Sequence, residues 1–340
     1  MPADLPAKSA PPRAILLVKT SSLGDVVHNL PVVTDLRSAF PETHIDWVVE
    51  EALVGIPRLH PAVRRVIPVG LRRWRKSLLA VQSWREIAAF RNELQAEAYD
   101  VVLDTQGLIK SGLIVRQARL AACGRRCGYI AEAAREPLAA RFYDFGFSVP
   151  KNLPAVERNR RLAASALGYA ADMSLDYGVA GNAADATGLA WLPGRPYVVL
   201  LTATSRDDKL WPEQHWVSLA ASLADRGLDC ILPAGTATER QRATRLVQQM
   251  SRAFVAPPLE IAGIAALCAG ARLVVGVDTG LTHLAVALER PTVALYGGSD
   301  PQLTGAYAGK AGLSRLRNLG APGAPAAADN AIAAALDLLG

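Results

Sequence analysis

The residues best suited to chemistry in this chain follow an aliphatic run near its C-terminal end. Residues 273–277 lead directly into Asp278, Thr279 and Gly280, and His283 follows one helical turn later. A helix that begins here would offer its first backbone N–H groups, which have no partner inside the helix, to an anion such as phosphate. Thr279 and His283 would share one helix face. The spacing predicts an anion site, although Asp278 as an ordinary N-cap followed by a surface histidine fits the same pattern.

A second candidate carboxylate, Asp25, follows the first expected strand, Ala14–Val18. Ser22 and Gly24 allow the backbone to approach a ligand closely. Asp25 could then act as a general base, a role worth about a hundred- to ten-thousand-fold in rate. Alternatively, Asp25 only complements the dipole of the helix that begins here, which is worth about 0.3–1 kcal/mol.

The second half of the chain repeats this arrangement after the expected strand Tyr197–Leu201. Thr204 and Ser205 follow that strand, and Lys209 lies four residues further on. Hydroxyl groups donate hydrogen bonds to phosphate oxygens and an ammonium group adds a compact charge, so this loop suits phosphate. A solvated loop with local Asp–Lys pairing, before a helix that starts at Pro212, fits the same residues.

Glu239 is a further candidate, because it follows the end of the expected strand 230–232. An acid in that position can accept the hydroxyl groups of a ribose. Thr238 and Gln241 have the spacing of a capping box, in which case Glu239 is merely an acid in the first helical turn.

The densest run of charge in the chain comprises Arg72, Arg73, Trp74, Arg75 and Lys76, with Arg64 and Arg65 upstream. Four cations around a tryptophan fit an anionic lipid headgroup or a phosphosugar, with Trp74 suited to a membrane interface. Nucleic-acid phosphates would fit equally, and so would a plain solvated loop.

The bulk composition limits the class of protein. The chain has 340 residues, which predicts about two domains, and its net charge of +6 favours anionic partners. No apolar stretch reaches the roughly 18 residues of a membrane-spanning helix, and the N-terminal tail lacks the apolar core of a signal peptide. The four cysteines are scattered, and Cys123 and Cys127 lack the further ligands of a zinc site. These features predict a cytoplasmic protein without structural disulfides.

Strand-like and helical runs alternate along the chain, as in doubly wound parallel sheets. The expected strands are Ala14–Val18, 45–49, 66–69, 99–103, Tyr197–Leu201, 230–232, Leu273–Val277 and 292–296. The expected helices include 25–39, 78–96, Ala155–Leu167 and 330–339.

These elements predict an α/β fold of two Rossmann-like domains whose strand ends face a central cleft. The expected division is an N-terminal domain at 13–172, a linker at 173–195, a C-terminal domain at 196–325 and a C-terminal helix at 326–340. Such a cleft suits an enzyme that brings a nucleotide-linked donor to an acceptor.

Missing motifs narrow the chemistry. There is no Asp-x-Asp pair to hold a metal-bridged diphosphate, and no Gly-x-Gly-x-x-Gly for a dinucleotide. Lys310 follows a glycine, but Ala311 stands where a phosphate-binding loop needs Ser or Thr. Hydride transfer and nucleoside triphosphate hydrolysis are therefore disfavoured.

Together these motifs resemble those of the lipopolysaccharide heptosyltransferases, a metal-independent, inverting family of GT-B glycosyltransferases. In the first half, the resemblance rests on the segments 19–25 (KTSSLGD), 46–51 (DWVVEE), 72–76 (RRWRK) and 134–139 (AREPLA). In the second half, it rests on 206–209 (RDDK), 211–212 (WP) and 277–284 (VDTGLTHL). The arginine–tryptophan run favours the type I enzymes of the family.

The resemblance implies transfer of L-glycero-D-manno-heptose from ADP-heptose to Kdo2-lipid A, without a metal or other cofactor, at the cytoplasmic face of the inner membrane. It makes Asp25 the general base and Lys209 the group that stabilises departing ADP. The implied donor-binding residues are Ser22, Gly24, Thr204, Ser205, Lys209, Glu239, Asp278, Thr279, Gly280 and His283. The implied acceptor-binding residues are Arg72, Arg73, Arg75, Lys76 and Arg135.

Two segments depart from the family pattern. Residues 202–205 read TATS where the family commonly has HATT, and 297–301 read GGSDP where it has GPTDP. The alternatives are a related enzyme that adds a later core heptose, and an epimerase of the same architecture acting on a nucleotide sugar. A basic nucleic-acid-binding protein is the rival from another class, but the aromatic platforms of single-strand binders are missing.

Overall fold

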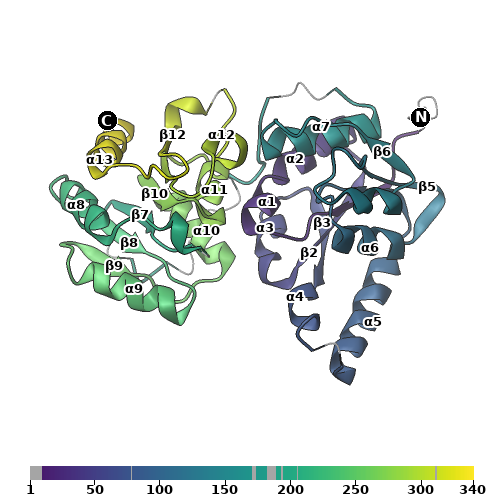
Figure 1. Cartoon of the computed structure of the whole chain (residues 1–340), viewed down its shortest axis with the longest axis horizontal. Coiled ribbons are helices and arrows are strands. Elements are labelled where there is room, and N and C mark those ends of the chain that lie inside the picture. The colour runs from purple at the N-terminus through teal and green to yellow at the C-terminus, as the bar shows by residue number, and fades with distance from the viewer. Residues whose placement is uncertain are drawn as a thin grey trace. The chain divides into compact units, whose positions relative to one another are not determined.

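The protein folds as two compact units, residues 1–178 and 179–340, which we call unit 1 and unit 2 (Figure 1). The structure is a computed structural model that describes residues 10–77, 79–170, 174–181, 189–192, 194–204, 206–310 and 312–340. Each unit contains a six-stranded sheet in which all strand pairs are parallel.

The sheet of unit 1 has the order β3-β2-β1-β4-β5-β6, so the direction of winding reverses beside β1. Its strands are β1 (Ala14–Val18), β2 (His44–Glu50), β3 (Val63–Val69), β4 (Tyr99–Asp104), β5 (Leu120–Tyr129) and β6 (Phe145–Phe147). Its helices are α1 (Leu23–Val27), α2 (Leu30–Ala39), α3 (Gly55–Arg58), α4 (Leu71–Trp74), α5 (Val81–Gln95), α6 (Ile109–Gln117) and α7 (Ala155–Leu167). In such a sheet, ligands bind beyond the carboxyl ends of the strands at the reversal.

Unit 2 repeats this plan with the order β12-β11-β10-β7-β8-β9. Its strands are β7 (Tyr197–Leu201), β8 (Asp229–Leu232), β9 (Ala253–Val255), β10 (Leu273–Val277), β11 (Thr292–Leu295) and β12 (Leu316–Leu319). Its helices are α8 (Glu213–Ala224), α9 (Ala237–Val247), α10 (Ile261–Gly270), α11 (Gly280–Ala287), α12 (Pro301–Thr304) and α13 (Ala328–Leu339). Here the winding reverses between β7 and β10, so the loops after these two strands are the expected ligand site.

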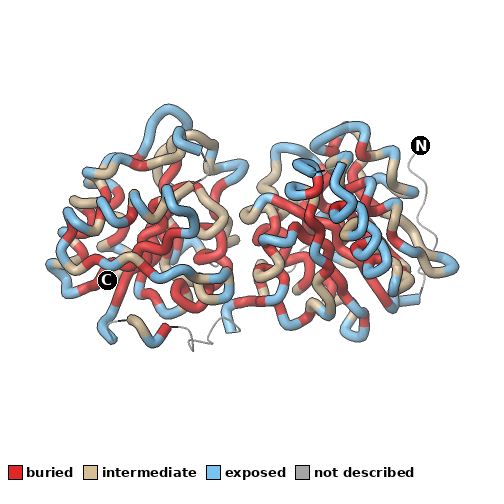
Figure 2. Tube along the Cα trace, turned by 90° about the horizontal axis from the view of Figure 1, so that it is seen from below, coloured by how far each residue is buried: buried red, intermediate tan, exposed pale blue. Residues whose placement is uncertain are grey.

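The central strands hold each unit together. Every residue of β1, β7 and β10 is buried, and the buried residues occupy the interior of each unit in Figure 2. A strand with helices against both faces must be apolar on both, which explains the unbroken aliphatic runs of these strands. Each fully buried Val, Leu or Ile side chain contributes roughly 1.5–3 kcal/mol.

The sequence predicted the central strands well and one long helix wrongly. β1, β7, β10 and α7 have the predicted bounds. The helix expected at 25–39 is instead divided into α1 and α2, because Pro31, in the first turn of α2, has no backbone N–H to donate to the carbonyl of Val27. The helix expected at 78–96 is α5, and Leu78 lies outside the described residues.

Some elements were not predicted, among them α6 and β5. The predicted domain bounds and the linker at 173–195 remain predictions, since much of that linker lies outside the described residues. No helix in the described part of the chain is long and apolar enough to cross a membrane.

Candidate active site

The predicted general base of unit 1 lies just beyond the carboxyl end of β1. Ser22 is the N-cap of α1, and its backbone N–H and hydroxyl each donate a hydrogen bond of 2.9 Å to Asp25 Oδ2. An Arg135 guanidinium nitrogen lies 3.6 Å from the same oxygen. Gly24 is part of the first turn of α1. The structure therefore brings together three groups that the sequence assigned separately: the base, the Ser22–Gly24 turn and one acceptor arginine.

The charge of Asp25 is set by its neighbours. Burial by itself would raise the pKa of the Asp25 carboxyl. The charges of Lys19 and Arg135 and the hydrogen bonds from Ser22 outweigh burial and hold that pKa below its ordinary value. Lys19 is itself buried, which lowers its pKa, and its Nζ donates to the carbonyl of Thr105 at 2.8 Å. Asp25 is thus ionised at neutral pH and ready to accept a proton.

Arg135 reaches Asp25 because the chain turns sharply at the end of β4. Gly107 has a φ of +67°, in the left-handed region, and a Cβ there would lie 3.3 Å from the backbone nitrogen of Arg135. The carbonyl of Gly107 accepts a hydrogen bond of 2.9 Å from the backbone of Glu136. A glycine at this position lets the Arg135 segment lie directly against the end of β4.

Sequence analysis missed Lys110 and Gln106, which support the same site from β4 and α6. Lys110 Nζ donates to Ser21 Oγ at 2.9 Å, and Gln106 binds the backbone of both Thr20 and Ser21. Burial lowers the pKa of Lys110 by more than the charge of Glu50 raises it, so this pKa lies below its ordinary value. The sequence did contain a signal for this loop, because polar side chains follow the buried strand β4 directly, as they do in the other loops of the site.

The basic run 72–76 contains one arginine that forms ion pairs and three further exposed cations. Arg73 forms a paired hydrogen bond with Glu51, at 2.8 and 2.9 Å, and also contacts Glu86. These two carboxylates already balance the charge of Arg73. Arg72, Arg75 and Lys76 are exposed and remain the better candidates to meet an anion.

The prediction that Trp74 is suited to a membrane interface is wrong. Its side chain is only 7% exposed, packs against Phe90 at 5.8 Å between ring centroids, and donates to Glu86 at 2.8 Å. Trp74 therefore belongs to the core of unit 1 and is not available to a membrane interface. The position of Trp74 within a charged run did not predict its burial, because burial of an aromatic residue depends on the residue that packs against it.

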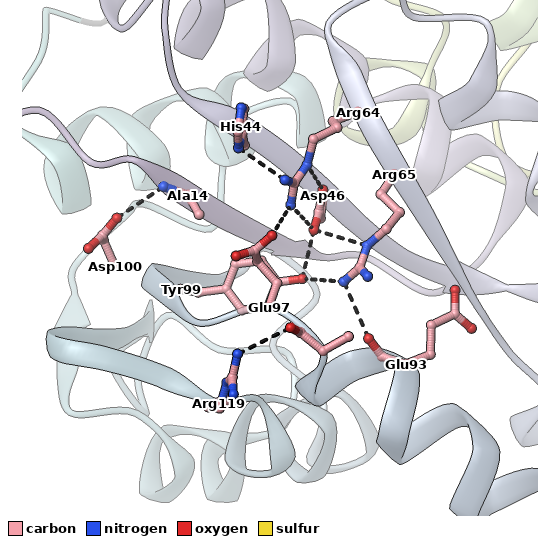
Figure 3. Close-up of polar contacts among 11 residues, drawn as sticks. Ala14, His44, Asp46, Arg64, Arg65, Glu93, Glu97, Tyr99, Asp100 and Arg119 are labelled. Atoms are coloured by element: carbon pink, nitrogen blue, oxygen red, sulfur yellow. Dashed lines mark hydrogen bonds and ion pairs between the residues drawn. The ribbon is translucent and has the colours of Figure 1, made fainter.

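Arg64 and Arg65, upstream of the basic run, are also engaged within unit 1 (Figure 3). Both contact the Asp46 carboxylate, at 2.8 and 3.2 Å, and Asp46 is completely buried between β1 and β3. The hydroxyl of Tyr99 donates to the same carboxylate at 2.8 Å. A buried charge needs such partners, so these arginines stabilise the sheet.

Three of the predicted donor residues of unit 2, Thr204, Lys209 and His283, converge on Asp278 at the carboxyl end of β10. Lys209 Nζ donates to Asp278 Oδ2 at 2.7 Å, and His283 Nε2 lies 3.5 Å from Oδ1. The Ser299 hydroxyl also donates to this carboxylate. Thr204 Oγ1 donates to the Asp278 carbonyl at 3.4 Å. The Thr204 hydroxyl, the Lys209 ammonium and the His283 imidazole, all predicted to bind an anion, therefore lie in one cluster.

Asp278 is the electrostatic centre of that cluster. Burial by itself would raise the pKa of the Asp278 carboxyl. Hydrogen bonds from His283, Lys209 and Ser299 outweigh burial and hold that pKa well below its ordinary value. The carboxylate stays ionised and keeps Lys209 beside the start of α11.

The start of α11 does not match the alternative in which Asp278 is an ordinary N-cap and His283 lies at the surface. The N-cap is Thr279 rather than Asp278, and His283 is buried rather than at the surface. Gly280 is the first residue of α11. The backbone N–H groups of this first turn follow directly on the Asp278 cluster, which is the geometry expected for holding an anion.

Glu239 is part of the capping box of α9, a role that the sequence spacing gave to Thr238 and Gln241. The capping box of α9 pairs Thr236 with Glu239: Thr236 Oγ1 accepts from the Glu239 N–H at 3.2 Å. Glu239 Oε2 accepts from the N–H groups of Gly235 and Thr236 at 2.8 and 3.0 Å. The alternative box between Thr238 and Gln241 is wrong, because α9 begins at Ala237. Ser205, the remaining donor residue, lies outside the described residues.

Comparison with known proteins decides the family. The model of glycosyltransferase family 9 (heptosyltransferase) matches residues 87–324, which is most of the chain. This chain belongs to glycosyltransferase family 9. The resemblance that the motifs indicated is confirmed, and so is the prediction of a glycosyltransferase.

Two curated relatives of this heptosyltransferase family member each match 86% of its length. Lipopolysaccharide heptosyltransferase 1 of Escherichia coli K12 is 47% identical over 294 residues, which are 86% of this chain and 90% of that protein. The protein of the same name from Pseudomonas aeruginosa is 47% identical over 295 residues, 86% of this chain and 81% of that protein.

Solved structures agree. The E. coli heptosyltransferase WaaC with ADP superposes with a TM-score of 0.83 at 45% identity, over 91% of this chain and 94% of that one. WaaC with ADP-2-deoxy-2-fluoro heptose gives a TM-score of 0.80 at 44% identity, with the same coverage. The predicted GT-B fold class with two Rossmann-like α/β domains is confirmed.

Proposed function

We propose that this protein transfers L-glycero-D-manno-heptose from ADP-heptose to the first Kdo of Kdo2-lipid A, with inversion at the anomeric carbon. The observation that carries this proposal is the likeness along both units to E. coli WaaC, which was solved with ADP and with a fluorinated ADP-heptose. The alternative of a later core heptose has less support: lipopolysaccharide heptosyltransferase 2 of E. coli is 34% identical over only 32% of this chain.

In the proposed mechanism, Asp25 accepts the proton of the acceptor hydroxyl. The acceptor oxygen forms its bond to the anomeric carbon while the bond from that carbon to the diphosphate breaks on the opposite face. One displacement inverts the centre, and the products are the heptosylated acceptor and ADP. Because the pKa of Asp25 is lowered, the carboxylate is available but weakly basic. The departure of the diphosphate must therefore supply much of the driving force.

We assign that departure to the Asp278 cluster. Lys209 is held at 2.7 Å from Asp278, beside the free N–H groups of α11, so positive charge is already in place where charge develops on ADP. Thr204, Ser205, Thr279, Gly280 and His283 complete the proposed phosphate site. Glu239 is proposed for the ribose, and Ser22 and Gly24 for the sugar. A lysine and a helix N-terminus here take the part of a metal ion, so the proposed reaction needs none.

The proposed acceptor is a polyanion, and unit 1 offers cations to it. Arg135 lies beside the proposed base, and Arg72, Arg75 and Lys76 are exposed. We propose that these residues, with Arg73 and Lys110, meet the carboxylates of Kdo and the phosphates of lipid A. An acceptor anchored in lipid also requires an anionic membrane surface as partner, with the enzyme peripheral at the cytoplasmic face of the inner membrane. Nucleic acid has no part in this proposal.

One assay tests the proposal. The purified protein is incubated with ADP-heptose and Kdo2-lipid A in the presence of EDTA, and the lipid product is weighed by mass spectrometry. We expect the addition of a single heptose, and its absence with Asp25→Asn. An acceptor that already carries the first heptose should not react. Reaction only with that acceptor would favour the type that adds a later heptose, and a requirement for metal would contradict the mechanism.

A further inference from the structure

Large apolar side chains are exposed to solvent just before α5 and in its first turn. Leu79 is fully exposed, Val81 is 68% exposed and Trp84 is 60% exposed. We call these three side chains the α4–α5 apex. Exposed apolar side chains that form a contiguous patch are a typical mark of an interaction surface.

The geometry of α5 sets the apex apart from the core. Val81 begins α5, so Val81 and Trp84 are three residues apart and lie on the same face. Phe90 and Leu94 lie further along the helix and are buried in the core of unit 1. In Figure 1 the N-terminal end of α5 projects beyond the strands of unit 1, at the lower tip of the picture. The body of α5 is therefore packed, while its first turn points outward.

The surroundings of the apex are strongly cationic. Between residues 71 and 91 the chain has six Lys and Arg residues and one acidic residue, Glu86. Glu86 contacts Arg73, which leaves the positive charge of the neighbours in excess. Arg75, Lys76 and Arg85 are all exposed.

This combination fits the surface of an anionic bilayer. Leu, Val and Trp side chains enter the boundary between headgroups and acyl chains, where Trp is especially favourable. Lys and Arg extend their charged ends to the lipid phosphates, and each such residue adds to the attraction of an anionic surface. The helix before the apex, α4, is joined to the end of β2 by a hydrogen bond of 2.9 Å from the backbone N–H of Arg72 to the Glu50 carboxylate.

We propose that the α4–α5 apex inserts into the interface of an anionic membrane, with Arg75, Lys76 and Arg85 on the lipid phosphates. The inference rests on the proposed function, whose acceptor is held in such a membrane. It assigns to Trp84 the interfacial role that the sequence suggested for Trp74. The polar side chains around β2 and α4 would then face an acceptor whose lipid part stays in the bilayer.

The first test measures binding of the full chain to vesicles by co-sedimentation. The vesicles contain either equal parts of phosphatidylglycerol and phosphatidylethanolamine, or phosphatidylcholine alone. We expect binding to the anionic vesicles only, and a loss of at least about tenfold in partitioning for the double variant Leu79→Ser, Trp84→Ser. The matched control replaces two exposed apolar residues of unit 2, Phe254→Ser and Leu313→Ser, and should partition as wild type. Equal partitioning of the two double variants would overturn the proposal.

A second measurement separates insertion from purely electrostatic binding. Bromine on the acyl chains quenches a tryptophan that enters the bilayer. The wild type should be quenched, and Trp84→Phe should lose that quenching while it still sediments with the vesicles. Quenching that persists in Trp84→Phe would place another tryptophan in the membrane and overturn the assignment.

Turnover with a deacylated, water-soluble Kdo acceptor distinguishes this inference from the proposed function. The apex variant should turn over that acceptor at the wild-type rate, because the apex contacts only lipid. If the wild type itself does not react, the proposed function fails, while the vesicle experiments still decide whether the apex binds a bilayer. If the apex variant alone loses turnover, the apex belongs to the acceptor site and the membrane assignment is wrong.

Discussion

At the scale of single residues, one carboxylate in each unit is surrounded by cations. Asp25 lies near Lys19 and Arg135, and Asp278 binds Lys209 and lies near His283. In both cases burial alone would favour the protonated acid, and the neighbouring charges reverse that effect. The two carboxylates nevertheless have different proposed tasks: Asp25 receives a proton, whereas Asp278 holds a lysine in place.

The substitution Asp25→Asn should remove the base and leave the donor site intact. We expect kcat to fall by about 10²–10⁴. ADP affinity, measured by calorimetry, should be unchanged, because the groups proposed for ADP are in unit 2. The exposed carboxylate Asp225 provides the matched control Asp225→Asn, which should leave both quantities unchanged. An equal loss of ADP affinity would show that Asp25 is needed for the fold.

The lowered pKa of Asp25 also fixes the sign of a pH effect. Asp25 ionises below its ordinary value of 3.8, so it loses its charge only when the pH falls through that lower pKa. The same shift stabilises the fold above the ordinary pKa, and this contribution is lost on further acidification. Arg135→Gln removes one cause of the shift, so the acid limb of the kcat/KM profile should move to higher pH. An unmoved limb would mean that Arg135 does not influence the base.

Lys209→Ala tests the second site. Charge develops on the diphosphate in the transition state, so kcat should fall by about 10²–10³ while the KM for ADP-heptose rises less. Steady-state kinetics at saturating acceptor separate the two quantities. Lys310→Ala, which changes an exposed lysine of the same unit, is the control. A raised KM with unchanged kcat would limit Lys209 to binding the ground state.

At the scale of elements, helix starts position most of the proposed groups. Asp25 lies in the first turn of α1, Glu239 in that of α9, and the Asp278 cluster directly precedes α11. Each helix follows the end of a buried parallel strand, so its first N–H groups lie at the carboxyl edge of the sheet of its own unit. The division between α1 and α2 matters here, because it makes α1 a short helix whose main polar feature is the Ser22–Asp25 contact.

The start of α9 allows the structural and ligand roles of Glu239 to be separated. Thr236→Ala and Glu239→Ala each remove half of the capping box, and each should lower the free energy of unfolding by about 0.5–2 kcal/mol. Urea unfolding measures that change. If Glu239 also binds the ribose, only Glu239→Ala should raise the KM for ADP-heptose. Equal KM values in the two variants would reduce Glu239 to a capping residue.

At the scale of the whole molecule, the two units repeat one architecture but present different chemistry. Unit 1 offers a base and exposed arginines, whereas unit 2 offers a helix N-terminus and a lysine at the end of its sheet. In both units the reversal of strand order marks the place where these groups lie. The proposed division of labour gives the acceptor to unit 1 and ADP to unit 2.

Binding of ADP alone should therefore be seen chiefly in unit 2. Hydrogen exchange measured by mass spectrometry should show protection at the starts of α9 and α11, with little change at α4 and α5. At a free ADP concentration of 100 times Kd, binding stabilises the native state by about 2.7 kcal/mol. Protection confined to unit 1 would reverse the assignment of the two units.

The sequence by itself determined the central strands and the loops that follow them. Aliphatic runs such as Leu273–Val277 can be buried only as strands covered on both faces, and the polar residues after them must lie at the sheet edge. The family resemblance assigned Lys209 and Asp278 to the same donor site, and the structure shows that their side chains are in contact.

Only the tertiary structure decided which aromatic side chains are buried and which charged side chains are paired. Trp74 and Trp84 stand in the same basic region, yet Trp74 packs on Phe90 and Trp84 is largely exposed. Arg73 is balanced by Glu51 and Glu86, which lie on separate elements. Lys110 joins the site from α6, a helix that was not predicted. Burial and charge pairing depend on residues far apart in the chain, so local spacing cannot determine them.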